Sequence, residues 1–165
     1  MSNPYTNSGE PELRDLKGNL WRVEADCWID TGVVGKPFRI MALPEPGRQL
    51  DPLRSCAERM VDGRLYVKKG YIFDGSSIPF FGRYLDNKVS SWPALVHDVT
   101  HEALRAGELP QSEFTPAAVL YGRMLRAFRS WWVTSKVAIA GLWIFGRRSA
   151  RRAPEYSRRV ARSAA

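Results

Sequence analysis

The chain has 165 residues, 44% of them hydrophobic, which is enough for one domain with its own core and too few for two. Its two cysteines, Cys27 and Cys56, exclude a small scaffold held together by disulfides, and we expect both to be reduced. Residues 1–18 are polar and lack the apolar stretch of a secretory signal, so we expect synthesis in the cytoplasm.

The formal net charge of +8 is concentrated at one end of the chain. Residues 147–165 contain one acidic residue, Glu155, and seven arginines: Arg147, Arg148, Arg151, Arg152, Arg158, Arg159 and Arg162. This segment carries +6 of the +8, so the rest of the chain needs no basic binding face. We expect a basic, flexible tail that either binds nucleic acid or an acidic partner, or is only solvated.

The N-terminal half has the patterns of strands. Residues 1–18 show no periodicity and are expected to form a flexible arm. Leu20–Asp30 alternates between apolar and polar side chains, which is typical of one half-buried strand. Phe38–Leu43 predicts a second strand, expected as the hairpin partner of the first.

Further strands are expected before residue 74. Asp51 and Pro52 have the form of a helix start and predict a short helix to about Met60. Asp62-Gly63 predicts a turn into a strand over Arg64–Lys68. A last strand, Tyr71–Phe73, delivers Asp74 to a turn. The N-terminal half is therefore expected to form a small, mostly antiparallel sheet.

Beyond Pro79 the apolar spacing changes from two to near four, which predicts helices. The first starts at Ser90 or Ser91, has Pro93 in its first turn and ends near Ala106, before Gly107. The second has Thr115 as its N-cap and Pro116 in its first turn, and runs to about Arg129. Its apolar face consists of Val119, Leu120, Met124, Leu125 and Phe128.

A third helix is expected over Trp131–Phe145, which is too short for the roughly twenty residues of a membrane span. We therefore expect a buried or interfacial helix there. Together these patterns predict one α+β domain over residues 19–146, a small mostly antiparallel sheet followed by about three helices, between a flexible arm and a basic tail.

The first of these helices contains both histidines of the chain, His97 and His101, which are four residues apart and so project from one face. His97-Asp98-Val99-Thr100-His101 matches the zinc-peptidase pattern H-E-x-x-H except that Asp replaces Glu. In such a site the two imidazoles hold zinc, and the carboxylate acts as a base on the metal-bound water. Asp98 is one methylene shorter than the glutamate of that pattern.

A metal site would need a third ligand, for which Asp74 is the first choice, followed by Glu102, Glu108 and Glu113. Two other interpretations of the His97/Asp98 pair remain open: a structural role, in which Asp98 holds the backbone amides of the Asp74 turn, and acid/base chemistry without a metal. Ser76 or Ser77 beside His97 could also be a nucleophile, although no G-x-S-x-G motif surrounds them.

The run Gly70-Tyr71-Ile72-Phe73-Asp74-Gly75-Ser76-Ser77-Ile78-Pro79, followed by Ala94-Leu95-Val96-His97-Asp98, resembles a family of small proteins of tailed bacteriophages and prophages known as domain of unknown function 1353. The resemblance covers about Leu65 to Gly146. It departs from the family at two places: His101-Glu102 replaces an Arg or Tyr, and Ala118 replaces a downstream aspartate. If that aspartate is a metal ligand in the family, His101 could be its substitute here.

The resemblance implies a phage origin. We expect a virion-associated structural or accessory protein, made in the cytoplasm of the bacterial host, that docks on other virion proteins. The alternative is a metal-dependent hydrolase of cell-wall peptide or glycan, with Asp74, His97 and His101 as ligands of zinc or another divalent metal and Asp98 as base. A third possibility is contact of Trp131–Phe145 and the arginines with a membrane surface.

Overall fold

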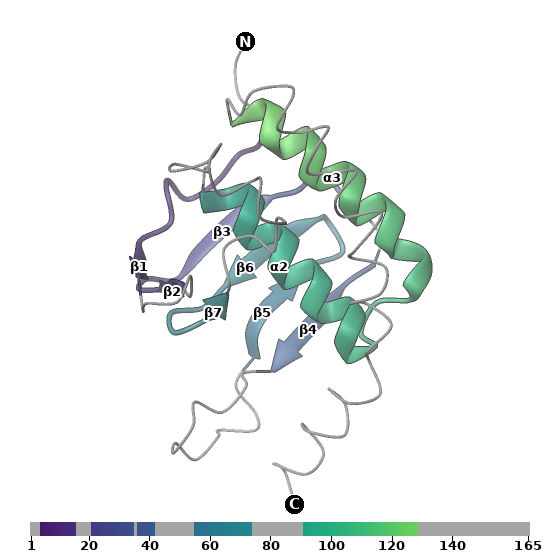
Figure 1. Ribbon diagram of the computed structural model, residues 1–165, viewed down its shortest axis with the longest axis horizontal. Helices are drawn as coiled ribbons and strands as arrows, with labels where there is room; N and C mark the ends of the chain where they lie inside the picture. The colour runs from purple at the N-terminus through teal and green to yellow at the C-terminus, as the bar shows by residue number, and fades with distance from the viewer. Residues whose placement is uncertain (1–3, 16–20, 35, 42–54, 74–90, 129–165) are drawn as a thin grey trace, which may run out of the picture.

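The computed structural model describes residues 4–15, 21–34, 36–41, 55–73 and 91–128. These residues form two antiparallel sheets and two α-helices, so the predicted α+β class is confirmed (Figure 1). No helix within these residues is long and apolar enough to cross a membrane. The predicted helix Trp131–Phe145 and the arginine-rich tail lie outside the described residues.

The larger sheet has four strands in the order β3-β6-β5-β4: β3 (Cys27–Asp30), β6 (Arg64–Val67), β5 (Ser55–Arg59) and β4 (Phe38–Met41). Its inner face is apolar except for Arg59, because alternate residues of each strand point the same way. The apolar inner residues are Cys27, Ile29, Leu65, Val67, Ala57, Phe38 and Ile40, all of them buried. Burial raises the pKa of the Cys27 thiol to about 11, in keeping with its expected reduced state.

The smaller sheet has three strands in the order β1-β2-β7: β1 (Leu13–Asp15), β2 (Trp21–Val23) and β7 (Ile72–Phe73). The prediction of one strand over Leu20–Asp30 is therefore wrong. Its two ends form β2 and β3, which belong to different sheets, and the chain changes partner at Glu24–Asp26.

The N-terminal segment also differs from the expected arm. β1 lies within it, the amide of Ser8 donates to the carbonyl of Trp28 (3.0 Å), and the amide of Asp30 donates to the carbonyl of Thr6 (2.8 Å). Residues 6–8 thus lie along the outer edge of β3. Farther on, the indole of Trp92 donates to the carbonyl of Gly9 (2.9 Å). The described part of this segment is packed onto the fold.

Two further predictions in the sheet region are wrong. β4 is confirmed as a strand, but its hairpin partner is β5, whereas β3 pairs with β6. The helix predicted to end near Met60 is instead the strand β5 in its described part. Ala57 and Arg59 both point inward, and inward side chains two residues apart are typical of a strand. Asp62-Gly63 is a turn as expected, but it joins two strands, β5 and β6.

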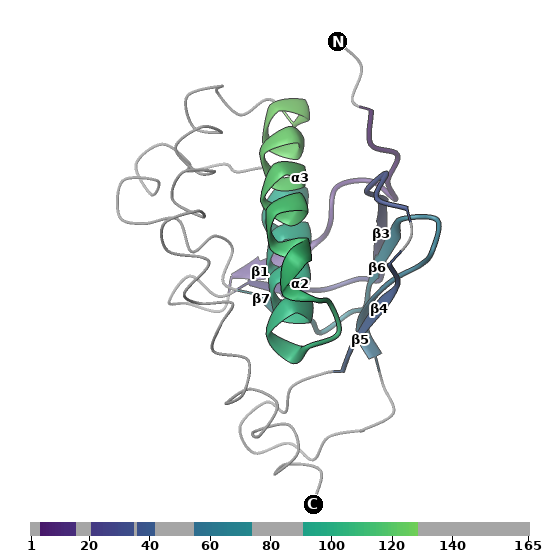
Figure 2. The ribbon, with the colours of Figure 1, turned by 90° about the vertical axis from the view of Figure 1, so that its right-hand side faces the viewer.

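Helices α2 (Ser91–Ala106) and α3 (Phe114–Ala127) pack against each other on one side of the four-stranded sheet (Figure 2). α2 begins and ends where the sequence predicts: Pro93 lies in its first turn, and Gly107 follows it with a φ of 79°. At this end the amide of Gly107 donates to the carbonyl of Leu104 (3.3 Å), and that of Leu109 to the carbonyl of Ala103 (3.2 Å).

The start of α3 differs from the prediction. A 3-10 turn, η1 (Gln111–Glu113), leads directly into the helix, so Glu113 occupies the N-cap position and Thr115 lies within the first turn. Pro116 is in the first turn, as predicted. The apolar face is only partly right: Leu120, Met124 and Leu125 are buried, but Val119 is 39% exposed and Tyr121 is buried.

We predict that Gly63→Ala destabilises the fold more than its matched control, Gly70→Ala. Both glycines have a positive φ (92° and 94°), but an added Cβ meets nothing within 4 Å at Gly70 and lies 3.0 Å from the backbone N and O of Val33 at Gly63. The strained φ should cost each variant about 1–2 kcal/mol. The displaced Val33 backbone should cost Gly63→Ala at least about 1 kcal/mol more. Urea denaturation measures both, and equal costs would contradict the close approach at Gly63.

Candidate functional site

The two histidines lie on one face of α2, as their spacing predicts. Their ring centroids are 4.2 Å apart with the planes tilted by 36°. His97 is 7% exposed and His101 is 5% exposed, and the Nε2 atoms of both rings are buried. The helix therefore brings two imidazoles into direct contact in the interior of the protein.

Asp98 contacts the first of these rings. His97 Nδ1 and Asp98 Oδ1 are 2.8 Å apart, and both side chains are almost entirely buried. An ionised carboxylate can only accept a hydrogen bond, so with Asp98 ionised and the imidazole neutral, Nδ1 carries the proton and Nε2 has the lone pair. Carboxylates that hold metal-binding or basic histidines in proteins act in this way. In this geometry Asp98 orients the ring of His97. This role differs from the role of base that the sequence pattern predicts for Asp98.

Aromatic side chains of α3 and its start enclose the histidine pair. The ring of Tyr121 lies 4.7 Å from that of His97, and the ring of Phe114 lies 5.5 Å from that of His101. Both aromatic residues are buried. The imidazoles therefore face the α2/α3 interface, and rings of the protein itself occupy the space beside them.

Two of the carboxylates considered as third ligands have other partners. Glu102 accepts a hydrogen bond from the hydroxyl of Tyr71 (2.7 Å), and Glu113 forms an ion pair with Lys36 (2.7 Å). Glu108 is exposed. Among the described residues, no three His, Cys, Asp or Glu side chains are grouped closely enough to hold a metal ion. Asp74, the first choice for the third ligand, lies outside these residues, so its role stays a prediction.

A buried cation that sequence reasoning missed lies on β5. Arg59 is 4% exposed; its Nε and Nη2 donate to the carbonyl of Lys36 (3.1 and 2.7 Å), and its guanidinium lies 5.0 Å from the centre of the Phe38 ring. Burial lowers the pKa of Arg59, and the negative charge of Glu113 partly offsets this effect. Only a slight signal in the sequence indicated this buried position: the arginine occupies an inward position of a short strand with alternating side chains.

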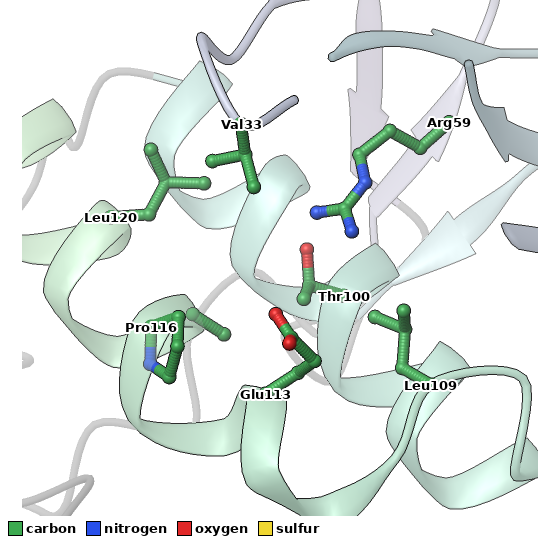
Figure 3. A pocket seen from close by; sticks show the side chains of 8 residues that line it. Val33, Arg59, Thr100, Leu109, Glu113, Pro116 and Leu120 are labelled. Atoms are coloured by element: carbon green, nitrogen blue, oxygen red, sulfur yellow. The ribbon is translucent and has the colours of Figure 1, made fainter. Parts of the chain in front are cut away.

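Arg59 lines a small cavity together with Thr100 and Glu113, whose oxygen atoms point toward the guanidinium (Figure 3). The cavity has a volume of about 10 Å³. That is close to the smallest volume that holds one water molecule, about 10–15 Å³. Its remaining walls are mostly apolar, including Val33, Leu109 and Leu120. It is too small for any substrate.

A larger groove lies next to this cavity and shares Val33, Pro116 and Leu120 with it. Its walls are Pro4–Tyr5, the turn Asp30–Val33, and residues Thr115–Arg123 of α3. Its volume is about 640 Å³, within the range of about 300–1,000 Å³ that is typical of binding sites. No local sequence pattern indicated this groove, because it is assembled from three separate segments.

Exposed apolar side chains accompany the groove. Val119 lines it and is 39% exposed, and Val34, which directly follows the lining residue Val33, is 73% exposed. The turn that holds Val33 and Val34 is fixed to the sheet: Thr31 donates to the carbonyl of Gly63 through its amide (3.1 Å) and its hydroxyl (2.7 Å). The groove is therefore a partly apolar surface on a well-supported framework.

Comparison with known protein families, with curated proteins and with solved structures finds no match to this chain. The resemblance of Gly70–Pro79 and Ala94–Asp98 to the phage family accordingly stays a prediction that rests on those residues alone.

We predict that Asp98→Ala lowers the free energy of unfolding by about 1.5–3 kcal/mol, the usual contribution of a hydrogen bond to a charged group. Glu108→Ala removes the same charge from an exposed position and should change stability by no more than about 0.5 kcal/mol. Urea denaturation compares the two variants. In the parent protein, ¹⁵N chemical shifts should identify the Nδ1–H tautomer of His97. Equal stability of the two variants would contradict a structural contact between Asp98 and His97.

Proposed function

We propose that this chain is a phage-encoded accessory protein of the virion that docks on other virion proteins. The observation that carries the proposal is the partly apolar groove beside α3, with Val119 exposed in its wall and Val34 exposed next to its lining residue Val33. Exposed apolar surface of this kind is typical of sites that bind another protein.

The chemistry of the groove favours binding over catalysis. Among the described residues, the charged side chains that line it are Asp30 and Arg123. The Oδ1 atom of Asp30 accepts a hydrogen bond from the amide of Gly32 (2.9 Å), so this carboxylate helps to shape the turn. The imidazoles, which are the usual proton carriers at neutral pH, lie in the α2/α3 interface and do not line the groove.

The phage part of the proposal rests on the resemblance of residues 70–79 and 94–98 to the tailed-phage family. The seven arginines of residues 147–165 add a second means of attachment, since they could contact an acidic protein or packaged nucleic acid. Contacts to phosphate would weaken as salt is raised and would not depend on base sequence.

The proposal predicts that the chain is a component of purified particles. Mass spectrometry of density-purified virions from a host that carries the gene should detect it. The variant Val119→Asp, which places a charge in the groove, should be depleted from particles by roughly tenfold, as for an unpaired charge buried at an interface. Val61→Asp is the matched control, since Val61 is 59% exposed and does not line the groove. Particles that lack the parent chain would contradict the proposal.

The second candidate is a metal-dependent hydrolase with Asp74, His97 and His101 as metal ligands. The observation that favours it is the histidine pair of α2, whose imidazole rings lie 4.2 Å apart. Asp98 contacts Nδ1 of His97, so in the neutral imidazole the lone pair is on Nε2 and points away from Asp98. In this candidate the described histidines would supply two ligands, and a zinc or similar ion would polarise the bond to be hydrolysed.

Metal analysis decides this second candidate. It predicts about one zinc or similar ion per purified chain, lost when His97→Ala and His101→Ala are combined. Added zinc should raise the melting temperature of the parent protein after chelation, because a bound ion stabilises the folded state. A control variant, Glu108→Ala, should keep the metal. A chain that binds no metal and gains no thermal stability from zinc would exclude the hydrolase.

A further inference from the structure

We propose that the groove beside α3 binds an extended peptide segment of the partner protein in which apolar side chains stand next to an acidic residue, and that Arg123 pairs with this acidic residue. The inference rests on the proposed docking function and names the chemistry of the segment that docks.

The apolar part of the ligand follows from the walls. Pro116, Val119 and Leu120 of α3 line the groove together with Pro4 and Val33. Filling a space of about 640 Å³ between such walls removes apolar surface from water, which is the main favourable term of association. An extended segment can place alternate side chains into a groove of this form.

The acidic part follows from the exposed guanidinium of Arg123. Asp30, the other charged side chain among the described residues of the groove, lies opposite Arg64 in the β3–β6 register and accepts a hydrogen bond from the amide of Gly32. Arg123 is exposed and forms no ion pair with any described residue. The Arg123 guanidinium is therefore the group at the groove that can pair with a carboxylate of a ligand.

Other occupants fit less well. Nucleic acid is bound by several cations spread along a surface, and Arg123 is the single cation that the described residues contribute to the lining of this groove. A second copy of the chain that docked through α3 would bring arginines together, because α3 contains Arg123 and Arg126 and no acidic residue. A peptide that carries its own carboxylate avoids both problems.

Selection from a displayed library of random peptides of about twelve residues tests the inference, because such segments span grooves of this type. Peptides selected on the immobilised full-length chain should be apolar and enriched in Asp and Glu over the input library by about two- to fivefold, the effect of one exposed ion pair. Peptides selected on the variant Arg123→Glu should instead be enriched in Lys and Arg. Arg126→Glu makes the same charge change at an exposed position of α3 outside the groove and should select like the parent.

Three results would overturn the inference: no enrichment over the input library, an acidic preference that Arg123→Glu leaves unchanged, or competition for the groove by a thymidine oligonucleotide. A dimer in light scattering that Val119→Asp abolishes would point instead to a second copy as the occupant.

The two proposals can fail separately. If Arg123→Glu is incorporated into particles as well as the parent while Val119→Asp is not, docking through the groove stands and the acidic partner segment is wrong. If the library gives the expected charge reversal but particles lack the chain, the groove chemistry stands and the virion role is wrong.

Discussion

The burial of α2 is the constraint on which the rest of this structure depends. One side of the helix packs on the sheets and another packs on α3, and residues such as Leu95 and Val99 are completely buried. A helix covered on several sides has little water for its polar side chains, so these groups must find partners inside the protein. Thr100 donates to the carbonyl of Val96 (2.7 Å), and His97 pairs with Asp98. The histidines considered as metal ligands or proton carriers are therefore also part of the interior packing.

Local signals were enough to predict α2, β4, β6 and β7. α2 has its first-turn proline and the glycine that ends it, and both features act within a few residues. The split between β2 and β3 was not predictable in this way, because the alternation of side chains continues through Glu24–Asp26 while the partner strands lie far along the chain. β5 was missed because the Asp51-Pro52 pair resembles a helix start and a buried arginine contradicts the usual pattern of a strand.

Helical spacing correctly placed His97 and His101 on one face, but it could not show what that face meets. The answer depends on α3, which brings Tyr121 and Phe114 against the rings. The groove was even less predictable from the sequence, because its walls come from three separate segments, residues 4–5, 30–33 and 115–123. Each segment is unremarkable by itself, and the surface exists only once the sheet has fixed the turn and α3 has docked on α2.

The bond between the indole of Trp92 and the carbonyl of Gly9 joins residues 83 positions apart, and the strip of chain that it holds covers the edge of β3. During synthesis on the ribosome, residues 4–9 and β3 emerge before α2, so the bond to Trp92 is the last of these contacts to become possible. Contacts between segments so distant in sequence form slowly. Until then the strip is held only by its bonds to β3. Whenever those bonds open, the outer edge of β3 can pair with a strand of another nascent chain.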